Sequence, residues 1–550
     1  MWNSYTGKGL IILESKKTLN YPNMRFFISL FALSFVFSCS ETDFDLLILN
    51  GSIVDGSGDN QYIADIAIIG DQIVRIGALS DFKSRHTIDA TDLIVSPGFI
   101  DSHTHAIRGI FDVPTAESSL LQGITTLTDG NDGTSPCPIG AHYRKIEKTK
   151  MSPNWAVFVG QGTVRKNVMG LGNRSPTSDE LSKMKTMVAN AMKDGALGIS
   201  TGLFYVPGSF STTEEIVELS QEAANYGGIY ISHMREEAVD VLKSVNETIN
   251  IGIEANIPVQ ITHHKIIGKG NWGLSSETLK LVDIAISKGV KVSIDQYPYT
   301  ASQTSITALI PQWAQAGGRK ELLKRIDSSE TRQILVDGIV ERILFDRGGG
   351  HPKNVFISKN TWDTSMEGKN LADLCIERGL DPTPHNAAMV VFDIIKGGGA
   401  SAVYHAIDSD DVDLIMQHPM TSIASDGPLT VFGVGSPHPR TYGTFARVLG
   451  SYVRERNILS LEEAIRKMTS LPAQILSIKK RGLIREGYYA DIAIFNPNTI
   501  IDKATFKDPH QYAVGVNSVI VNGSIVVENG VHNGSRPGRV LRGPGYKKTN

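Results

Sequence analysis

Two histidines that flank a single threonine, His103 and His105, are the side chains of this sequence best suited to chemistry. They follow an apolar run, 93–101, that is typical of a buried strand. Because alternate residues of a strand point to the same face, both imidazoles can reach one small cation at the end of that strand. Zinc favours such nitrogen ligands. A pair of hydrogen-bonded surface histidines is the alternative interpretation.

Further potential metal ligands stand at the ends of later apolar runs. They are Asp129 and Asp132 after 123–128, His233 after 228–232, His263 and His264 after 258–262, and Asp426 after 420–425. Each one could instead be a satisfied core histidine or an aspartate that caps the following helix. In a (β/α)8 barrel, however, the carboxyl ends of the strands converge on one cavity, so ligands scattered through the sequence meet in space. The recurrence predicts one metal site built from several strand ends.

The elements that would position these ligands alternate along the middle of the chain. Helical patterns at 178–194, 213–226, 238–255 and 276–288 lie between the apolar runs. Such alternation predicts an α/β fold with a parallel sheet, and we expect a (β/α)8 barrel over 97–479.

The stretch 302–385 interrupts this rhythm with charged helical segments and the triplet Gly348-Gly349-Gly350. We interpret it as an insertion that roofs the active site, because long insertions at strand ends of a barrel often carry specificity. A strand is expected to resume at 389–395.

Short β-rich segments occur at both ends of the chain. We expect a hairpin over 44–56, turning at Asn50 and Gly51, and 521–526 has nearly the same sequence. These segments predict a small β-sandwich built from both termini, 40–96 and 480–545. Two separate small β units are the alternative.

An apolar run at 26–37 is too short to span a bilayer but suits the core of a signal peptide. It leads to Cys39 in a pattern that resembles the cleavage site of a bacterial lipoprotein. We therefore expect an over-extended start at 1–23, a lipoprotein-type signal up to Cys39, and export to the periplasm or outer membrane with a lipid anchor on that cysteine. A buried N-terminal helix is the alternative.

The composition narrows the classes of partner. Hydrophobic residues make up 41% and charged residues 20% of the chain, as in ordinary globular proteins with a large core. Its 54 basic and 57 acidic residues leave a net charge of −3, so nothing indicates nucleic-acid binding. After Cys39 only Cys137 and Cys375 remain, too few for a disulfide framework. A small polar or anionic substrate is compatible with this balance.

Several segments match one known family. They are FIDSHTH at 99–105, GITT at 123–126, SHMR at 232–235, THHK at 262–265, YPY at 297–299, SDG at 425–427 and HPRTYGTF at 438–445. Together they resemble the D-aminoacylase, or N-acyl-D-amino-acid deacylase, branch of the amidohydrolase superfamily. The resemblance covers about 45–543, and it implies a (β/α)8 barrel beside a β-sandwich from both termini, as the patterns above predict. The SHMR, THHK and HPRTYGTF segments are far more specific to the branch than the His-x-His pair, which marks only the superfamily.

The resemblance also implies roles for the matching residues. His103 and His105 would bind one metal position, and His233 and His263 another, with one or two Zn²⁺ ions as the cofactor. Asp426 would contact the water at the metal site and act as the catalytic residue.

One turn departs from the family pattern. Many members bridge the two metals with a cysteine in a Gly-Asn-Cys-Gly turn, whereas this chain has Asp132 at that place in 130–133. A carboxylate can bridge two cations through its two oxygens but selects less for thiophilic metals. Cys137 follows five residues later; we expect it to pack in its loop as a small hydrophobe rather than bind metal.

Substrate binding is assigned by the same resemblance. Lys265, Tyr297 and Arg440 would bind the substrate carboxylate, with Tyr205 as a further contact. The alternatives are a solvated lysine, packed rings and an arginine paired with a loop carboxylate. His264 is expected to face away from His263 as a core or supporting histidine.

The activity that the resemblance implies is hydrolysis of the linear amide bond of an N-acyl-D-amino acid. Water activated by the metal would attack the carbonyl, and Asp426 would pass its proton to the departing nitrogen. A D-dipeptidase or a cyclic-amide hydrolase of the same superfamily is one alternative, and a lipoprotein that binds a ligand without turning it over is another.

Overall fold

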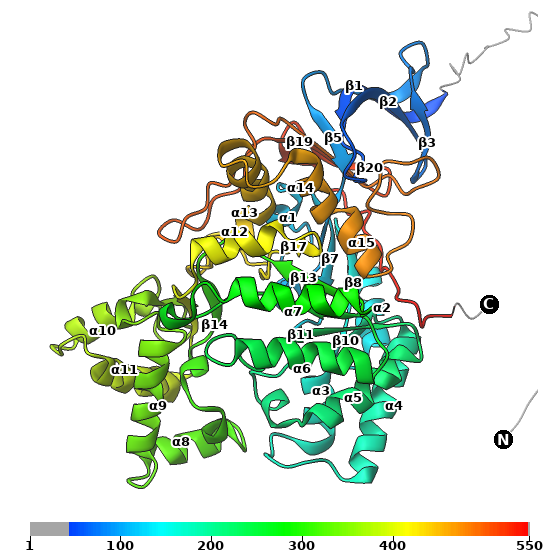
Figure 1. Cartoon of the computed structure of the whole chain (residues 1–550). Coiled ribbons are helices and arrows are strands. Elements are labelled where there is room, and N and C mark those ends of the chain that lie inside the picture. Colours follow the sequence, from blue (N-terminus) through cyan, green and yellow to red (C-terminus); the bar gives the residue numbers. More distant parts are fainter. Residues whose placement is uncertain (1–42, 548–550) are drawn as a thin grey trace, which may run out of the picture. The chain divides into compact units, whose positions relative to one another are not determined.

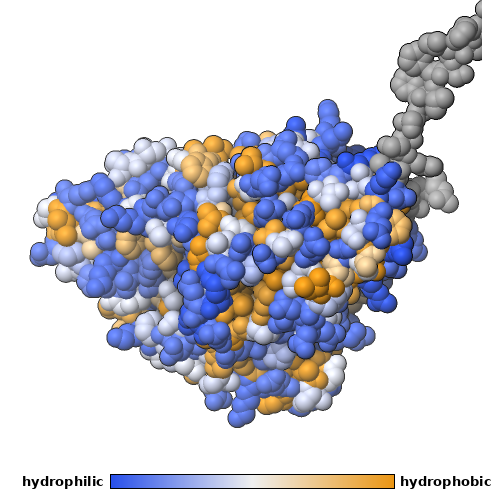
Figure 2. All heavy atoms as spheres, turned by 90° about the horizontal axis from the view of Figure 1, so that it is seen from above, coloured by the Kyte–Doolittle hydropathy of each residue, from blue (hydrophilic) through white to orange (hydrophobic). Residues whose placement is uncertain are grey.

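The computed structural model describes residues 43–547 (Figure 1). The expected signal segment and Cys39 lie outside the described residues. Within 43–547, no helix combines the length and the apolar character needed to cross a bilayer. On the face shown in Figure 2, hydrophobic residues form scattered groups between hydrophilic ones.

Parallel strands form a barrel at the centre of the fold. In order they are β6 (Phe99–Asp101), β7 (Ile124–Asp129), β8 (Asn154–Val157) with β9 (Val159–Gly160), β10 (Gly198–Gly202), β11 (Ile229–His233), β12 (Val259–Ile261), β13 (Val292–Gln296) and β17 (Thr421–Ile423). Only Phe158 separates β8 from β9, so the two act as one barrel strand. The circle closes beyond the ends of β17 and β6, where the Asp426 amide donates to the His103 carbonyl at 2.8 Å. The expected (β/α)8 barrel is confirmed.

Helices follow the strands and cover the outside of the barrel (Figure 1). They include α2 (Ile139–Thr149), α3 (Gln161–Met169), α4 (Ser178–Asp194), α5 (Thr213–Ala224), α6 (Val241–Glu254), α7 (Ser275–Ser287), α12 (Ser409–Gln417), α14 (Leu461–Met468) and α15 (Ser470–Ile475). Local signals explain where α4 begins and ends. Thr177 and Glu180 form a reciprocal capping box, and Gly195 ends the helix in a left-handed conformation.

Strands from both ends of the chain share one sheet, in the order β21-β20-β19-β18-β5-β1-β2-β3, and β4 pairs with β1. Their bounds are β1 (Phe44–Ile53), β2 (Tyr62–Ile69), β3 (Gln72–Gly77), β4 (Ser84–Asp89), β5 (Ile94–Pro97), β18 (Ile492–Phe495), β19 (Val516–Val521), β20 (Ser524–Glu528) and β21 (Val531–His532). The junction between the two ends is the antiparallel pair β5 and β18. Gly98 divides the apolar run 93–101 between this sheet and barrel strand β6.

The expected hairpin at 44–56 is wrong. Asn50 and Gly51 interrupt the register of β1 against β2 as a bulge, and the strand continues through them. Asn50 adopts a left-handed φ of 63°, and its amide donates to the Asp65 carboxylate at 2.8 Å, which stabilises the bulge. The same dipeptide at 522–523 does form the turn of a hairpin, between β19 and β20.

The insertion is a subdomain with its own apolar core, lying to one side of the barrel in Figure 1. It contains the antiparallel strands β14 (Ser302–Ser305), β16 (Ser401–Tyr404) and β15 (Val355–Lys359), and the helices α8 (Arg319–Asp327), α9 (Arg332–Phe345), α10 (Leu371–Glu377) and α11 (Pro384–Gly397).

The insertion therefore ends at Tyr404 rather than at 385, and the run 389–395 lies in α11 instead of a strand. Thr383 caps α11 and Pro384 occupies its first turn, both of which are helix-start signals. The helix is apolar almost all round because it is buried, and periodicity alone does not separate such a helix from a strand.

A buried ion pair connects the terminal sheet to the barrel. Asp491, immediately before β18, accepts hydrogen bonds from the Arg481 guanidinium, from the Asn522 amide at 2.7 Å and from Asn154 Nδ2 at 2.9 Å. Asn154 belongs to barrel strand β8. Both side chains of the ion pair are 3% exposed, so water cannot solvate either charge when its partner is removed.

Replacing Asp491 by alanine is expected to lower the free energy of unfolding by about 3–5 kcal/mol, because it leaves Arg481 as an uncompensated buried charge. Denaturant unfolding of purified protein measures this. The matched control is Asp71→Ala, whose partner Arg539 is 47% exposed and can be solvated instead. Equal losses in the two variants would contradict the role given to the buried pair.

Candidate metal centre and active site

The His-x-His segment lies directly after β6 and is held against β7. Thr104 donates through its hydroxyl to the Thr128 carbonyl at 2.7 Å. The buried Asp129 carboxylate accepts from the Ile107 amide at 2.6 Å and from the Gly130 amide. Asp129 therefore shapes the backbone around the two histidines rather than offering itself as a ligand.

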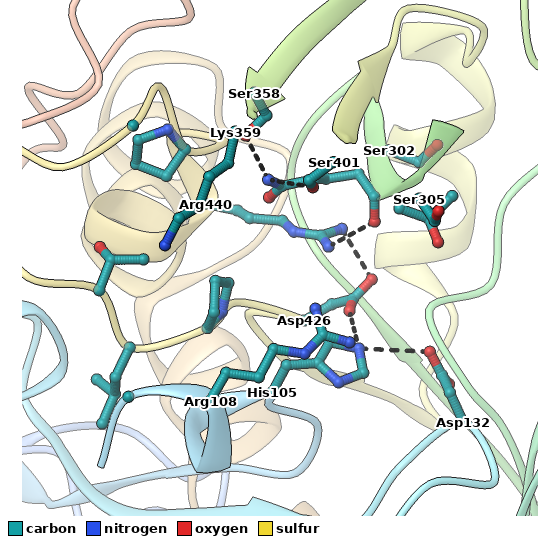
Figure 3. Close-up of a pocket in the computed structure, with 18 of the residues that line it drawn as sticks. His105, Arg108, Asp132, Ser302, Ser305, Ser358, Lys359, Ser401, Asp426 and Arg440 are labelled. Carbon is teal, nitrogen blue, oxygen red and sulfur yellow. Dashed lines mark hydrogen bonds and ion pairs between the residues drawn. The ribbon is translucent and has the colours of Figure 1, made fainter. Parts of the chain in front are cut away.

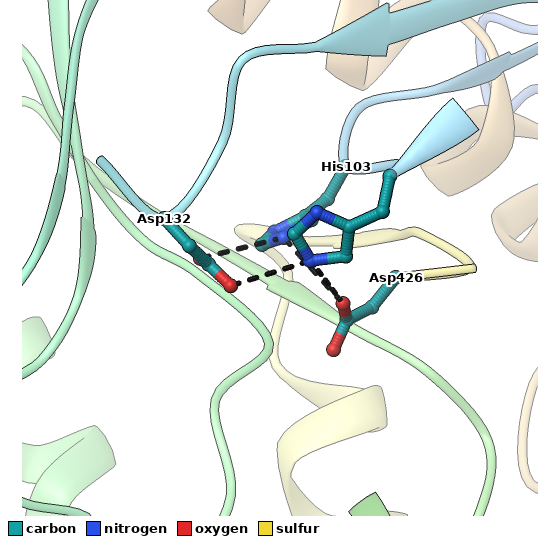
Figure 4. A group of neighbouring side chains, drawn as sticks. His103, Asp132 and Asp426 are labelled. Carbon is teal, nitrogen blue, oxygen red and sulfur yellow. Dashed lines mark ion pairs between the residues drawn. The ribbon is translucent and has the colours of Figure 1, made fainter. Parts of the chain in front are cut away.

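The first group of potential ligands combines His103 and His105 with Asp132 and Asp426 (Figure 4). His105 Nε2 lies 3.1 Å from Asp426 Oδ1 and 3.4 Å from Asp132 Oδ2. His103 Nε2 lies 3.5 Å from Asp132 Oδ1. One donor atom from each of the four residues lies within 4.8 Å of the others, as needed to surround one cation.

The second group consists of Asp132, His233 and His263. His263 Nε2 lies 3.4 Å from Asp132 Oδ1, and His233 Nδ1 lies 3.6 Å from Asp132 Oδ2. His233 Nδ1 lies 2.7 Å from His263 Nε2. Because Asp132 belongs to both groups and has two carboxylate oxygens, it is placed to bridge two cations.

The donor set fits divalent metal. His103 Nε2 and Asp132 Oδ1 are buried and have no hydrogen-bond partner among residues 43–547. Buried polar atoms are rarely left unpaired, and a cation would satisfy both. All donors are nitrogen or oxygen, which suits borderline to hard divalent ions. Cys137 is exposed, so the expectation that it packs in its loop as a small hydrophobe is wrong. It belongs to neither ligand group and supplies no ligand there.

Asp426 is held by Arg440 (Figure 3). The Arg440 guanidinium donates to Asp426 Oδ2 at 2.7 Å, and Asp426 Oδ1 faces His105. Burial alone would raise the pKa of Asp426, but Arg440 and His105 outweigh it and hold that pKa well below its usual range. Arg440 begins α13 (Arg440–Arg447), where its amide donates to His438 Nδ1 at 3.0 Å. His438 in turn donates through Nε2 to the Ala301 carbonyl at 2.9 Å, so this histidine orients the arginine.

Of the residues expected to bind substrate, Lys265, Arg440 and Tyr205 line the cavity at the metal groups, whereas Tyr297 packs behind Arg440 and does not line it. Lys265 Nζ donates to Glu237 Oε1 at 2.6 Å and to the His263 carbonyl at 2.9 Å. The Tyr297 ring lies 4.7 Å beneath the Arg440 guanidinium, and its hydroxyl is buried. Lys265 is thus paired with a carboxylate rather than solvated.

Tyr205 and His264 also have defined positions. Tyr205 shares a 3.0 Å hydrogen bond with Thr304 and packs its ring 4.6 Å from that of His233. His264 lies outside both metal groups, and its Nε2 is 2.8 Å from the Thr278 hydroxyl.

Three further residues support the ligands and were not predicted. Glu237 is fully buried. Its carboxylate accepts hydrogen bonds from Lys265 and, at 3.3 Å, from Arg347 of the insertion. Asp295 accepts from the His263 amide at 2.6 Å and lies 3.4 Å from His103 Nδ1. Asp295 sits in β13, so the strand-end rule could have found it. Glu237 and Arg347 lie outside the strands and carry no comparable signal.

A cavity of about 580 Å³ opens over the metal groups. This volume is typical of a small-molecule site. Its walls comprise residues of both metal groups, the ends of the insertion strands and the loop 428–437.

A barrel with two histidine and carboxylate groups at the carboxyl ends of its strands defines a metal-binding hydrolase of the amidohydrolase type. The pattern of the amidohydrolase family matches residues 86–325 and 390–527, and the chain belongs to this family, in its D-aminoacylase branch. The unmatched stretch between these ranges lies within the insertion.

The similar proteins are named for related activities. A D-aminoacylase of Alcaligenes xylosoxydans xylosoxydans is 35% identical over 90% of this chain and 97% of its own length. An N-acyl-D-aspartate deacylase and an N-acyl-D-glutamate deacylase of the same organism are 33% and 32% identical over 90% of this chain, and over 95% and 96% of their own lengths.

Solved structures that are similar to this chain include deacylases of the same branch. An N-acyl-D-glutamate deacylase from Bordetella bronchiseptica, complexed with zinc and a phosphonate inhibitor, is 32% identical with a TM-score of 0.77, covering 91% of this chain and 100% of its own. A D-aminoacylase studied for its binuclear metal centre has the same TM-score, identity and coverage. A D-hydantoinase at 16% identity has a TM-score of 0.54 over 92% of this chain and 100% of its own, and shares the fold alone.

Proposed function

We propose that the protein hydrolyses the linear amide bond of N-acyl-D-amino acids, releasing a carboxylate and a free D-amino acid. The observation that carries this proposal is the pair of ligand groups that share Asp132 beneath a cavity, with Asp426 as a member of the first group. Similarity to three deacylases of N-acyl-D-amino acids over nearly the whole chain supports the substrate class.

The proposed cofactor is Zn²⁺, one or two ions per chain. His103 and His105 would hold one position, His233 and His263 the other, and Asp132 would bridge them. When bound, such ions supply Lewis acidity that activates water and polarises a carbonyl oxygen. The zinc of the similar N-acyl-D-glutamate deacylase supports this choice of metal.

Asp426 is the proposed proton carrier. Its Oδ1 faces the cavity between His103 and His105, while Oδ2 is held by Arg440. Arg440 keeps the carboxylate ionised, so that it accepts a proton as water adds to the carbonyl carbon. The C–N bond then breaks as Asp426 returns this proton to the amine nitrogen, which completes the hydrolysis.

Arg440 lines the cavity and is the donor that we assign to the substrate carboxylate, with Tyr297 packed behind its guanidinium. The Tyr297 hydroxyl and Arg440 Nε are buried without a hydrogen-bond partner in the described part of the chain. Lys265 is already paired with Glu237, so we assign it mainly to orienting His263, with its positive charge adding to the field at the site. Tyr205 lines the cavity next to His233 and would contact the substrate from that side.

A substrate panel tests the proposed function. N-acetyl-D-amino acids are expected to be hydrolysed on the order of 100-fold faster than their L-isomers, because an inverted centre misplaces either the carboxylate or the amide. D-terminal dipeptides and cyclic imides are the comparison substrates. Faster turnover of either class, or equal turnover of L-isomers, would replace the proposal with one of the alternatives.

The proposal extends to location. We propose export as a lipoprotein anchored at Cys39, in the periplasm or on the outer membrane, with no nucleic-acid partner and no other membrane contact. The sequence pattern of 26–39 is what supports it. Fractionation should find the protein with membranes, and a Cys39→Ser variant that stays equally membrane-bound would count against the anchor.

A further inference from the structure

The charges that line the cavity are not all matched. Lys265 and Arg347 both contact Glu237, and Arg440 contacts Asp426. The two remaining cations of the lining are Arg108 and Lys359, and neither forms an ion pair within residues 43–547.

The carboxylates of the lining offset at most one of these two cations. Asp132 and Asp426 also line the cavity, but both belong to the metal groups. Asp112 is then the one lining carboxylate left in the described part of the chain. Arg108 lies close enough to Asp129 for its charge to lower the pKa of that carboxyl, so the unmatched positive charge of the lining is chiefly that of Lys359, which favours an anionic ligand beside it.

Lys359 stands where it can meet a substrate. It ends β15, and Figure 3 shows its side chain reaching into the cavity from the insertion. The preceding Ser358 carbonyl accepts from the Ser436 amide at 2.7 Å, which fixes the end of β15 against the loop 428–437. An added Cβ at Gly435 would lie 3.7 Å from Lys359 Cβ and Cγ, so the stem of the lysine runs along this loop.

The wall on the insertion side of Lys359 is polar. Residues of the insertion strands and their flanks line it with hydroxyl and amide groups, namely Ser302, Gln303, Thr304, Ser305, Ser358 and Ser401. Gln303 Nε2 donates to the Ser358 hydroxyl at 2.6 Å. A long apolar substituent in this place would strip water from these groups without replacing their hydrogen bonds. The insertion side of the cavity therefore disfavours apolar side chains, whereas Leu429, Val431 and Val434 make the loop side apolar.

We propose that the cavity selects N-acyl-D-amino acids with an acidic side chain, and that Lys359 determines this specificity by binding the side-chain carboxylate. The inference rests on the proposed function and narrows its substrate class. D-glutamate and D-aspartate derivatives share the chemistry, and the length of the side chain distinguishes them.

Initial rates on N-acetyl-D-glutamate, N-acetyl-D-aspartate, N-acetyl-D-glutamine and N-acetyl-D-leucine, with the metal-loaded full chain, test the inference. At least one acidic substrate is expected to exceed D-glutamine and D-leucine by about 10-fold or more in kcat/KM, since only a side-chain carboxylate can form a charged hydrogen bond with the Lys359 ammonium. In Lys359→Gln this preference should fall by about 10-fold or more, chiefly through KM, while the neutral substrates change little.

Lys353→Gln is the matched control, because Lys353 is an exposed lysine of the same insertion outside the cavity lining. A wild-type preference for the neutral substrates, or an equal loss on all four substrates in Lys359→Gln, would overturn the inference while leaving the proposed function standing. Absence of hydrolysis of every N-acetyl-D-amino acid would overturn the proposed function and the inference together.

Discussion

Replacing Asp426 by asparagine is expected to lower kcat/KM for an N-acyl-D-amino acid by about 10²–10⁴-fold, the usual contribution of a positioned general base and acid. Asparagine keeps the size of the side chain and its contact with Arg440, but it cannot take a proton from water. The expected loss therefore lies in kcat. Steady-state kinetics with the D-isomer preferred in the substrate panel measures it.

Metal content separates this role from that of a ligand. His103, His105 and Asp132 remain in Asp426→Asn, so bound metal per chain is expected to stay at the wild-type level. Asp413→Asn serves as the control. Asp413 lies on α12, pairs with Arg456 and does not line the cavity. Near-normal turnover in Asp426→Asn would refute its catalytic assignment, and loss of metal would make it chiefly a ligand.

Replacing Asp132 by asparagine is expected to weaken both metal positions at once, since this carboxylate belongs to both ligand groups. Changes to the outer partners of metal ligands typically cost 10–100-fold in affinity, so loss of a shared ligand should cost at least about 100-fold. Asparagine tolerates the left-handed backbone at this position, where φ is 53°. Metal analysis after dialysis, with turnover on the same sample, measures the effect.

Asp132→Cys is the matched variant. A thiolate at the same place can again bridge two cations, and it should shift the preference toward softer ions such as Cd²⁺ over Mn²⁺. We expect this variant to bind at least as many ions per chain as the wild type, and Asp132→Asn to bind fewer. Two tightly held ions in Asp132→Asn would show that the carboxylate does not bridge.

The candidate metal ligands could be predicted from sequence because of a general geometric rule. Each of His103, His233, His263 and Asp426 stands at or just beyond the end of an apolar strand, and the barrel brings such ends together. The supporting residues follow no such rule. Glu237 acts from a loop after β11, and Arg347 comes from the insertion more than a hundred residues later, so only the folded chain shows that both adjoin the site.

The errors of prediction have physical causes as well. Asn50-Gly51 and Asn522-Gly523 are the same dipeptide, yet the first bulges within a long strand because Asp65 accepts its amide. The run 389–395 was expected as a strand because it is continuously apolar, whereas α11 is apolar because the insertion buries it on nearly every side. An apolar run in the sequence indicates that a segment is buried, but tertiary packing determines whether that segment is a helix or a strand.

The central claim is that side chains from distant strand ends hold divalent metal that is required for amide hydrolysis. The most direct test measures metal content and turnover of an N-acetyl-D-amino acid on one sample, before chelation, after chelation and during titration with Zn²⁺. We expect activity to vanish with the metal and to return as one to two equivalents bind per chain. Full activity in the metal-free protein, or no stoichiometric binding by the folded chain, would contradict the account.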